Sequence, residues 1–162
     1  MSRAGGLIFL LSLLCAGCCA RYHLGTCSQP PFSTISVAPV ESLVDCPGLR
    51  GILWHQTCQE IQQIATAGAA AGATAGELTL RIVSLDRIPT LSAPNCGGDQ
   101  RITLVALCTL RDRRTGATPI ADRPVRASVY LPGGQDIYGG QAMSELTAAL
   151  AREIRDLVAN SW

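Results

Sequence analysis

The segment Arg101–Arg111, with the sequence RITLVALCTLR, decides the fold of this chain. Its apolar side chains alternate with polar or smaller ones, which is the period of a β-strand, and its centre is almost continuously apolar. A strand of this kind is typically covered on both sides by neighbouring strands. Because this segment is longer and more apolar than the other strand candidates, we expect it to lie in the middle of a β-sheet.

Two further strands are predicted beside it, at residues 77–85 and 122–131. Both alternate apolar and polar residues, so each has one face for a core and one for solvent. The core-facing side chains are Leu78, Leu80 and Ile82 in the first strand and Val125, Ala127, Val129 and Leu131 in the second. The connections are a Pro- and Gly-containing loop at 88–98 and a polar turn at 112–116. Three consecutive strands joined by polar connections predict an antiparallel meander.

Two amphipathic helices are predicted, over residues 49–65 and 141–162. Apolar side chains recur at three- and four-residue steps in both, which places them on one stripe of each helix. The predicted stripe of the first helix consists of Leu49, Leu53, Trp54, Cys58, Ile61 and Ile64. The predicted stripe of the second consists of Met143, Leu146, Leu150, Ile154, Leu157 and Val158.

A short alternating segment, residues 35–40, precedes the first helix and is predicted to be a strand. Pro39 lacks an N–H group, so this strand should lie at or near a sheet edge. The order of elements is therefore β-α-β-β-β-α. It predicts an α+β fold of two layers, in which a four-stranded sheet carries both helices on one face and leaves its other face free.

The N-terminal residues are typical of an export signal. Arg3 precedes about ten apolar residues, too few to span a bilayer core of about 30 Å, and the small residues Ala16 and Gly17 follow. A buried N-terminal helix is the alternative, but small residues suit a protease cleft better than a core. We predict a signal peptide at 1–17, a lipidated tether at 18–34 and a single α+β domain at 35–162.

Cys18 is the predicted lipidation site. A bacterial lipoprotein signal ends with a small pair directly before the modified cysteine, as Ala16 and Gly17 stand before Cys18, although Cys15 occupies the position where leucine is usual. The spacing Cys15-x-x-Cys18 also fits a redox or zinc motif. That alternative is weaker, because Cys15 lies in the part expected to be removed. A lipid on Cys18 would anchor the chain to a membrane without spanning it.

Composition excludes some partners. The chain has 13 basic residues, all arginine, and 12 acidic ones, so it is nearly neutral and no electrostatic attraction to nucleic acid is expected. No Gly-rich loop follows a strand in a way that would hold phosphate, and no cofactor is expected. Six cysteines follow Cys18, and their pairing cannot be deduced from the sequence. They are Cys19, Cys27, Cys46, Cys58, Cys96 and Cys108.

Two readings of these cysteines stay open. Cys58 and Cys108 fall on apolar faces and can serve as small buried hydrophobic residues. In an oxidising compartment, Cys27, Cys46 and Cys96 are better candidates for a bridge, because they lie in Pro- and Gly-rich loops.

Few side chains suggest catalysis. His55 and Cys58 are three residues apart on a predicted helix and could form half of a metal site or a Cys–His pair. A surface histidine beside a buried cysteine is the favoured interpretation, because no second ligand pair completes a four-coordinate site. We assign no catalytic and no metal-binding residues and do not expect an enzyme.

Several segments together resemble the LptE family of lipopolysaccharide-assembly lipoproteins. The start at 18–25 (CCARYHLG) is similar to the first residues of mature LptE proteins, and 35–40 (ISVAPV) is similar to their first strand. The strand and turn at 109–116 (TLRDRRTG) and the final helix around 150–154 (LAREI) also resemble the family. The resemblance implies helices on one side of a four-stranded sheet, in agreement with the order above.

The resemblance further implies a lipid-anchored protein on the periplasmic side of the outer membrane. It would dock with an LptD-like β-barrel, help the barrel assemble and contact lipopolysaccharide. Arg113, Arg114 and Arg126 are candidate ligands for lipopolysaccharide phosphate, because guanidinium groups suit phosphate. Solvated arginines on a turn and a strand are the alternative.

Two other functions stay open. One is an accessory lipoprotein subunit of a lipid transporter or of a cell-wall synthesis complex. The other, of a different class, is a thiol- or metal-dependent enzyme that uses His55 and Cys58.

Overall fold

The computed structural model describes residues 32–65, 74–90, 99–132 and 140–161. The predicted signal peptide, Cys18 and most of the predicted tether lie outside these residues. The elements in chain order are β1 (Phe32–Val37), β2 (Glu41–Ser42), α2 (Leu49–Ala65), β3 (Thr74–Pro89), β4 (Gln100–Asp112), β5 (Ile120–Leu131) and α3 (Gln141–Ala159). The predicted α+β fold is confirmed, with the short strand β2 as an addition.

The segment that opens the sequence analysis forms the central strand β4. The sheet order is β1-β3-β4-β5, and β4 is antiparallel to both of its neighbours. Every second residue of β4 is buried, and together these side chains form the middle of the core. They are Ile102, Leu104, Ala106, Cys108 and Leu110, each of which is fully inaccessible to solvent.

The edge beside β3 is split into two short strands. β1 and β2 both run parallel to β3, and α2 provides the crossover that parallel neighbours require. The Ala38 N–H donates to Leu78 O (2.8 Å), and ladder bonding resumes where the Leu43 N–H donates to Ile82 O (3.0 Å). Pro39 lies between these bonds and has no N–H to offer. The predicted strand at 35–40 is therefore wrong in its end, since β1 stops at Val37, but its place at an edge is confirmed.

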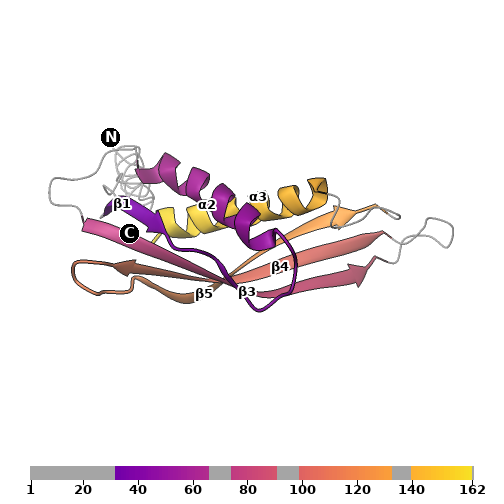
Figure 1. Cartoon of the computed structure of the whole chain (residues 1–162), viewed down its shortest axis with the longest axis horizontal. Helices are drawn as coiled ribbons and strands as arrows, with labels where there is room; N and C mark the ends of the chain where they lie inside the picture. The colour runs from indigo at the N-terminus through magenta and orange to yellow at the C-terminus, as the bar shows by residue number, and fades with distance from the viewer. Residues whose placement is uncertain (1–31, 66–73, 91–98, 133–139, 162) are drawn as a thin grey trace, which may run out of the picture.

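Both helices cover the same face of the sheet (Figure 1), and they run in the same direction. The predicted stripe of α3 is confirmed, with its members buried except for the half-buried Leu157. The stripe of α2 is corrected at Trp54, whose side chain is 41% exposed. The core-facing row of α2 follows steps of four residues and includes a threonine: Leu49, Leu53, Thr57 and Ile61.

A β-bulge divides β3 into two halves, and the side-chain alternation between the two faces of the sheet reverses from one half to the other. Ile82 pairs with Ala106 and Ser84 with Val105, so Val83 is the extra residue. Before the bulge, Leu78, Leu80 and Ile82 face the helices. After it, Leu85 takes that side and packs against the core, while Ser84 turns to the opposite face.

Candidate functional site: the open face of the sheet

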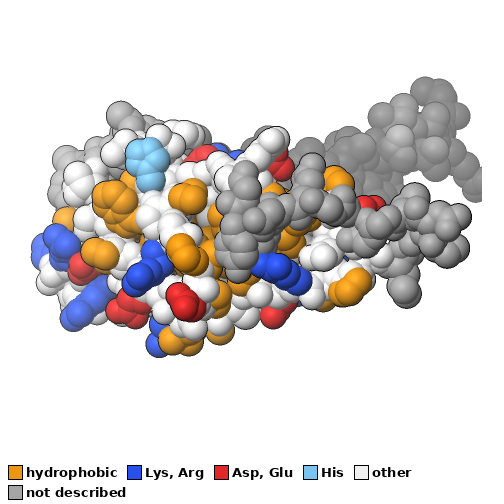
Figure 2. All heavy atoms as spheres, turned by 45° about the vertical axis from the view of Figure 1, so that its right-hand side comes forward, with side chains coloured by type: hydrophobic (Ala, Val, Ile, Leu, Met, Phe, Trp, Pro, Cys, Tyr) orange, Lys and Arg blue, Asp and Glu red, His pale blue; other side chains and the backbone are white. Residues whose placement is uncertain are grey.

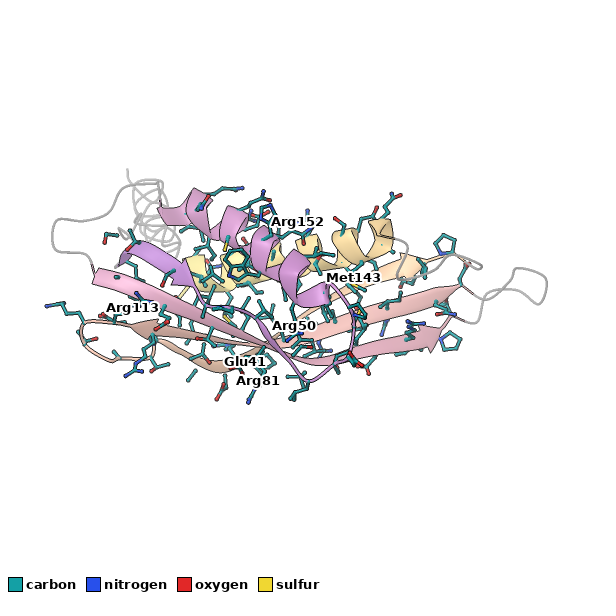
Figure 3. All side chains as sticks on the ribbon, in the orientation of Figure 1. Glu41, Arg50, Arg81, Arg113, Met143 and Arg152 are labelled. Atoms are coloured by element: carbon teal, nitrogen blue, oxygen red, sulfur yellow. The ribbon has the colours of Figure 1, made fainter. Side chains whose placement is uncertain are left out.

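The face of the sheet opposite the helices is the candidate site, and we call it the open face. No helix within the described residues covers it (Figure 1). Strand alternation and the pairing register place on it Arg81 from β3, Val105 and Leu107 from β4, and Arg126 from β5. Figure 3 shows the Arg81 side chain directed away from both helices, whereas Arg152 of α3 lies on the opposite side of the molecule.

The centre of the open face is apolar and has a guanidinium group on each side. One row of paired residues runs Arg81–Leu107–Pro124, and the next pairs Val105 with Arg126. Val105 and Leu107 are half-buried. None of the ion pairs among the described residues involves Arg81 or Arg126. Since an arginine stem is apolar and its head is charged, this arrangement suits a partner that is part apolar and part anionic.

Hydroxyl and carboxylate groups on the same face bond to one another. The Thr103 and Ser128 hydroxyls lie 2.8 Å apart across β4 and β5. Thr109 Oγ1 donates to Asp122 Oδ1 (3.2 Å) and accepts from the Asp122 N–H (3.1 Å). Asp122 has a φ of 44°, a left-handed conformation that aspartate tolerates better than most residues. These bonds hold the open face in one shape.

The three predicted phosphate ligands do not form one cluster. Arg113 and Arg114 lie in the β4–β5 turn, where Arg113 Nη2 is 3.2 Å from Glu77 Oε1 and the Arg114 N–H donates to Asp112 Oδ1 (2.8 Å). Arg126 lies far along β5, about 20 Å from the strand's start at 3.3 Å per residue. Arg81 is the companion of Arg126 across the apolar centre. The alternation of residues 77–85 was the sequence signal for Arg81, because it places Arg81 on the face of the strand that Leu80 and Ile82 do not occupy.

His55 and Cys58 lie on α2 above the edge strand β1. Both line a groove of about 550 Å³ with side chains of β1. His55 Nε2 lies 3.1 Å from the Gln59 amide nitrogen. Burial raises the pKa of the Cys58 thiol, whereas an activated thiol has a lowered pKa. Among the described residues, no three His, Cys, Asp or Glu side chains are grouped so that they could hold a metal ion.

The described cysteines are all free thiols, namely Cys46, Cys58 and Cys108. Cys46, one of the three candidates for a bridge, is a buried free thiol in this structure, and burial raises its pKa against the opposing effect of Arg87. Cys108 is buried as predicted, while Cys58 is only half-buried. Cys19, Cys27 and Cys96 lie outside the described residues.

Cys108 should respond to pH in a characteristic way. Burial raises the pKa of its thiol to about 12, so the folded state keeps it neutral above pH 9, where the unfolded chain ionises. When the pKa of a group is higher in the folded protein than in the unfolded chain, its contribution to stability is present in full below the unfolded-state pKa. That contribution is lost as the pH rises from the unfolded-state pKa toward the folded-state pKa. We expect this group to lower the free energy of unfolding by up to about 1.4 kcal/mol per pH unit above pH about 9. Urea unfolding of the wild type and of Cys108→Ala between pH 8 and about 11 measures it; equal slopes would contradict the assignment.

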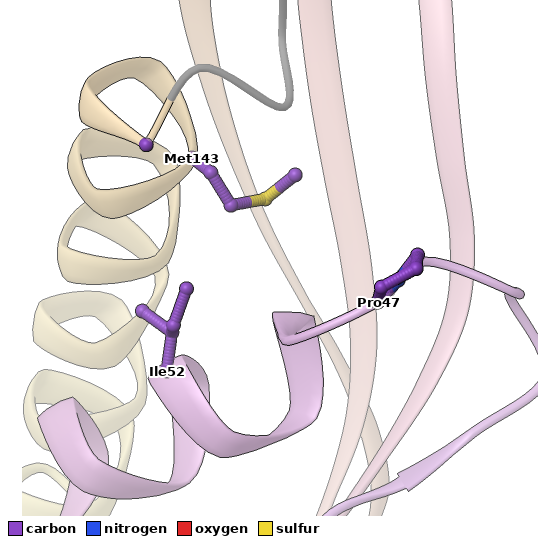
Figure 4. Close-up of a pocket in the computed structure, with 4 residues that line it drawn as sticks. Pro47, Ile52 and Met143 are labelled. Atoms are coloured by element: carbon purple, nitrogen blue, oxygen red, sulfur yellow. The ribbon is translucent and has the colours of Figure 1, made fainter.

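A second hollow lies where α2 and α3 begin (Figure 4). It has a volume of about 390 Å³ and is lined by Pro47, Ile52, Gly140 and Met143. This lining carries no titratable group, so the hollow is apolar and has no evident chemistry. None of the described helices is both long enough and apolar enough to cross a bilayer.

Comparison with solved structures shows that the fold is similar to those of several bacterial proteins. The hypothetical protein CT253 from Chlamydia trachomatis superposes with a TM-score of 0.56 at 13% identity, over 80% of this chain and 97% of that one. Lower-scoring matches include a minor lipoprotein from Acinetobacter baumannii (TM-score 0.43, 14% identity, 79% of this chain and 90% of that one). Another is the rare lipoprotein B from Shewanella oneidensis, an LptE-like protein (TM-score 0.32, 15% identity, 78% and 88%). No family model and no curated protein matches the sequence.

Proposed function

We propose that this chain is an envelope lipoprotein that docks through its open face with an LptD-like β-barrel and assists lipopolysaccharide assembly at the outer membrane. A lipid on Cys18 would hold it on the periplasmic side. The observation that carries the proposal is the open face itself, with an apolar centre between Arg81 and Arg126. Such a surface is suited to binding a neighbour, and it is held by rigid strands.

The charge distribution supports docking within a barrel. The lumen of an outer-membrane barrel is polar, and large barrels can hold a plug. A plug should therefore present polar groups of both signs and little net charge. The chain carries 13 basic and 12 acidic residues, and Figure 2 shows side chains of both signs interspersed with hydrophobic ones.

Lipopolysaccharide offers phosphate beside acyl chains, which matches the chemistry of the open face. Guanidinium groups form bidentate bonds with phosphate oxygens. Arg126 and Arg81 flank half-buried Val105 and Leu107, so a phosphate and an apolar chain could be bound side by side. Arg113 and Arg114 would contribute a separate contact at the β4–β5 turn.

Reversing the two flanking charges should remove the partner. In the double variant Arg81→Glu and Arg126→Glu, we expect recovery of the β-barrel partner after detergent extraction to fall about tenfold, because like charges would face the barrel or the phosphate. The measurement is affinity purification of the full chain followed by quantitative mass spectrometry, which also reports acylation at Cys18.

Arg152→Glu is the matched control, because Arg152 is exposed on α3 on the other side of the molecule. It should leave partner recovery unchanged, and circular dichroism should confirm that all variants fold. Equal recovery with the double variant and the wild type would rule out docking through the open face. Recovery of an inner-membrane complex in place of a barrel would favour the accessory-subunit function.

A further inference from the structure

The outer end of the open face carries two exposed apolar side chains with an arginine between them. Ile88 of β3 pairs with Arg101 of β4, and Arg101 pairs with Tyr130 of β5. Side chains of directly paired residues lie on the same face of a sheet, with Cβ atoms about 5 Å apart. The three side chains therefore form one patch, which we call the outer row. It lies about 13 Å beyond Val105 along the strands, at about 3.3 Å per residue.

The outer row is accessible, and its polar groups are unpaired among the described residues. Ile88 is 48% exposed and Tyr130 is 70% exposed, and Arg101 is exposed between them. No hydrogen bond or ion pair among the described residues involves the Arg101 guanidinium or the Tyr130 hydroxyl. The outer row thus offers apolar surface, one cation and one hydroxyl to a ligand.

An acidic side chain lies next to the outer row. Asp86 is on the adjacent row of the open face, where it pairs with Thr103, and its Oδ2 accepts from the Ser84 hydroxyl (2.9 Å). The charge of Asp86 offsets that of Arg101, so the outer row does not attract polyanions in general. A ligand has to use the apolar side chains and the single guanidinium at the same time.

The headgroup layer of a phospholipid bilayer has this combination of chemistry, because phosphate lies there beside acyl carbons. Tyrosine and arginine suit such a layer, since each has an apolar body and a polar tip. Tyrosine is enriched at membrane interfaces for this reason, and guanidinium binds phosphate oxygens with two parallel bonds. A protein partner fits less well, because three side chains supply little of the about 800 Å² that each side of a stable protein interface buries.

We propose that the outer row contacts the phospholipid headgroups of the leaflet that holds the lipid on Cys18. This inference rests on the anchoring at Cys18, which is part of the proposed function. Phe32 follows Cys18 by 14 positions, and a fully extended chain spans about 3.5 Å per residue, so the tether can reach about 49 Å. Phe32 pairs with Thr74, and Ile88 lies about 46 Å further along β3. The anchor and the outer row can therefore reach the same bilayer.

The tether also explains why so small a contact is enough. A chain that is already held at the bilayer meets its surface at a high effective concentration, so a weak contact becomes populated. The outer row lies at the end of the sheet that extends past the helices (Figure 1). Arg81 and Arg126 lie on other rows, so they remain available for docking with the barrel.

Photochemical crosslinking of the full acylated chain tests the contact. A photoreactive benzophenone amino acid replaces Ile88, and the protein is reconstituted in vesicles of phosphatidylethanolamine and phosphatidylglycerol. We expect lipid adducts from this position, detected by mass spectrometry. The control carries the same group in place of Arg152, which is exposed on α3 on the other side of the molecule, and should give few lipid adducts. An equal yield of lipid adducts at the two positions would overturn the proposal.

Variants of the outer row show whether its side chains make the contact. With the photoreactive group at position 88, Arg101→Glu should lower the yield of lipid adducts about tenfold, because a carboxylate would then face the phosphate. Arg101→Lys keeps the charge and should retain most of the yield. Asp86→Asn should raise the yield about threefold, because it removes the acid beside the outer row. An unchanged yield with Arg101→Glu would contradict the proposal, as would adducts with a second copy of the chain in place of lipid.

The same variants separate this inference from the proposed function. Arg101→Glu should leave recovery of the barrel partner unchanged. The double variant Arg81→Glu and Arg126→Glu should leave the lipid adducts from position 88 unchanged. Absence of lipid adducts together with normal partner recovery would overturn the contact of the outer row alone. A purified chain without lipid on Cys18 would contradict both proposals, and its mass would reveal this.

Discussion

Replacing Leu104 with alanine should lower the free energy of unfolding by about 2 to 5 kcal/mol. Leu104 is fully buried at the middle of β4, where it pairs with Leu85 on one side and Ala127 on the other. The loss combines the transfer free energy of the removed atoms with the cost of a cavity. It should be near the upper end of this range, because strands on both sides and helices above prevent the site from collapsing. Urea unfolding followed by circular dichroism measures it.

Val105→Ala is the matched control on the next residue. Val105 faces the open side of the same strand and is half-buried, so its truncation should cost less than about 1 kcal/mol. If the two variants were destabilised equally, the assignment of the two faces of β4 would be wrong. The proposed docking surface would then lose its basis, because it depends on Val105 and Leu107 being outside the core.

Gly76→Val should destabilise the fold by about 1 to 3 kcal/mol through overpacking. A Cβ atom built at Gly76 would lie 3.1 Å from Phe32 Cδ1 and 3.3 Å from Leu110 Cδ1. Both neighbours are buried side chains, so we expect either the Phe32 ring or the β1–β3 pairing to shift. Thermal unfolding gives the size of the loss, and near-ultraviolet circular dichroism reports the ring.

Gly51→Ala provides the opposite control. Gly51 is exposed on α2, and nothing lies within 4 Å of the position its Cβ would take. Alanine there should raise stability by about 0.5 to 1 kcal/mol, since glycine is a poor helix former. A loss at Gly51, or no effect at Gly76, would contradict the packing described for these two positions.

The strands and helices of this chain could be predicted where the pattern of apolar residues within a segment is enough to identify its secondary structure. Alternation in β4 and β5, and the stripe of α3, depend only on residues within the element. Trp54 was misassigned because, on a helix, a residue at the border of the stripe can point either way, and its exposed place depends on β1 beneath it. The bulge at Val83 was missed because it exists only in the pairing of β3 with β4.

The candidate site was harder to predict for the same reason. Arg113 and Arg114 are adjacent in sequence, and their charge attracts notice, but they lie in a turn away from Arg126. Arg81 comes from a distant segment, and only the strand order brings it to the other side of Leu107. A surface assembled from three strands is a property of register, and a single sequence carries little information about register beyond each strand's own alternation.

The two short strands β1 and β2 pair with only the first half of β3, so the two halves of β3 should differ in local stability. Up to Ile82, β3 is held by strands on both sides, whereas from Ser84 to Pro89 β4 is its one strand partner among the described residues. That outer half extends past the helices (Figure 1), and Ile88 in it is 48% exposed. The outer end of β3, residues 84–89, can therefore open on its own while the rest of the sheet stays closed. The protein thus combines a stably paired sheet with one strand end that can adjust its position to a neighbour.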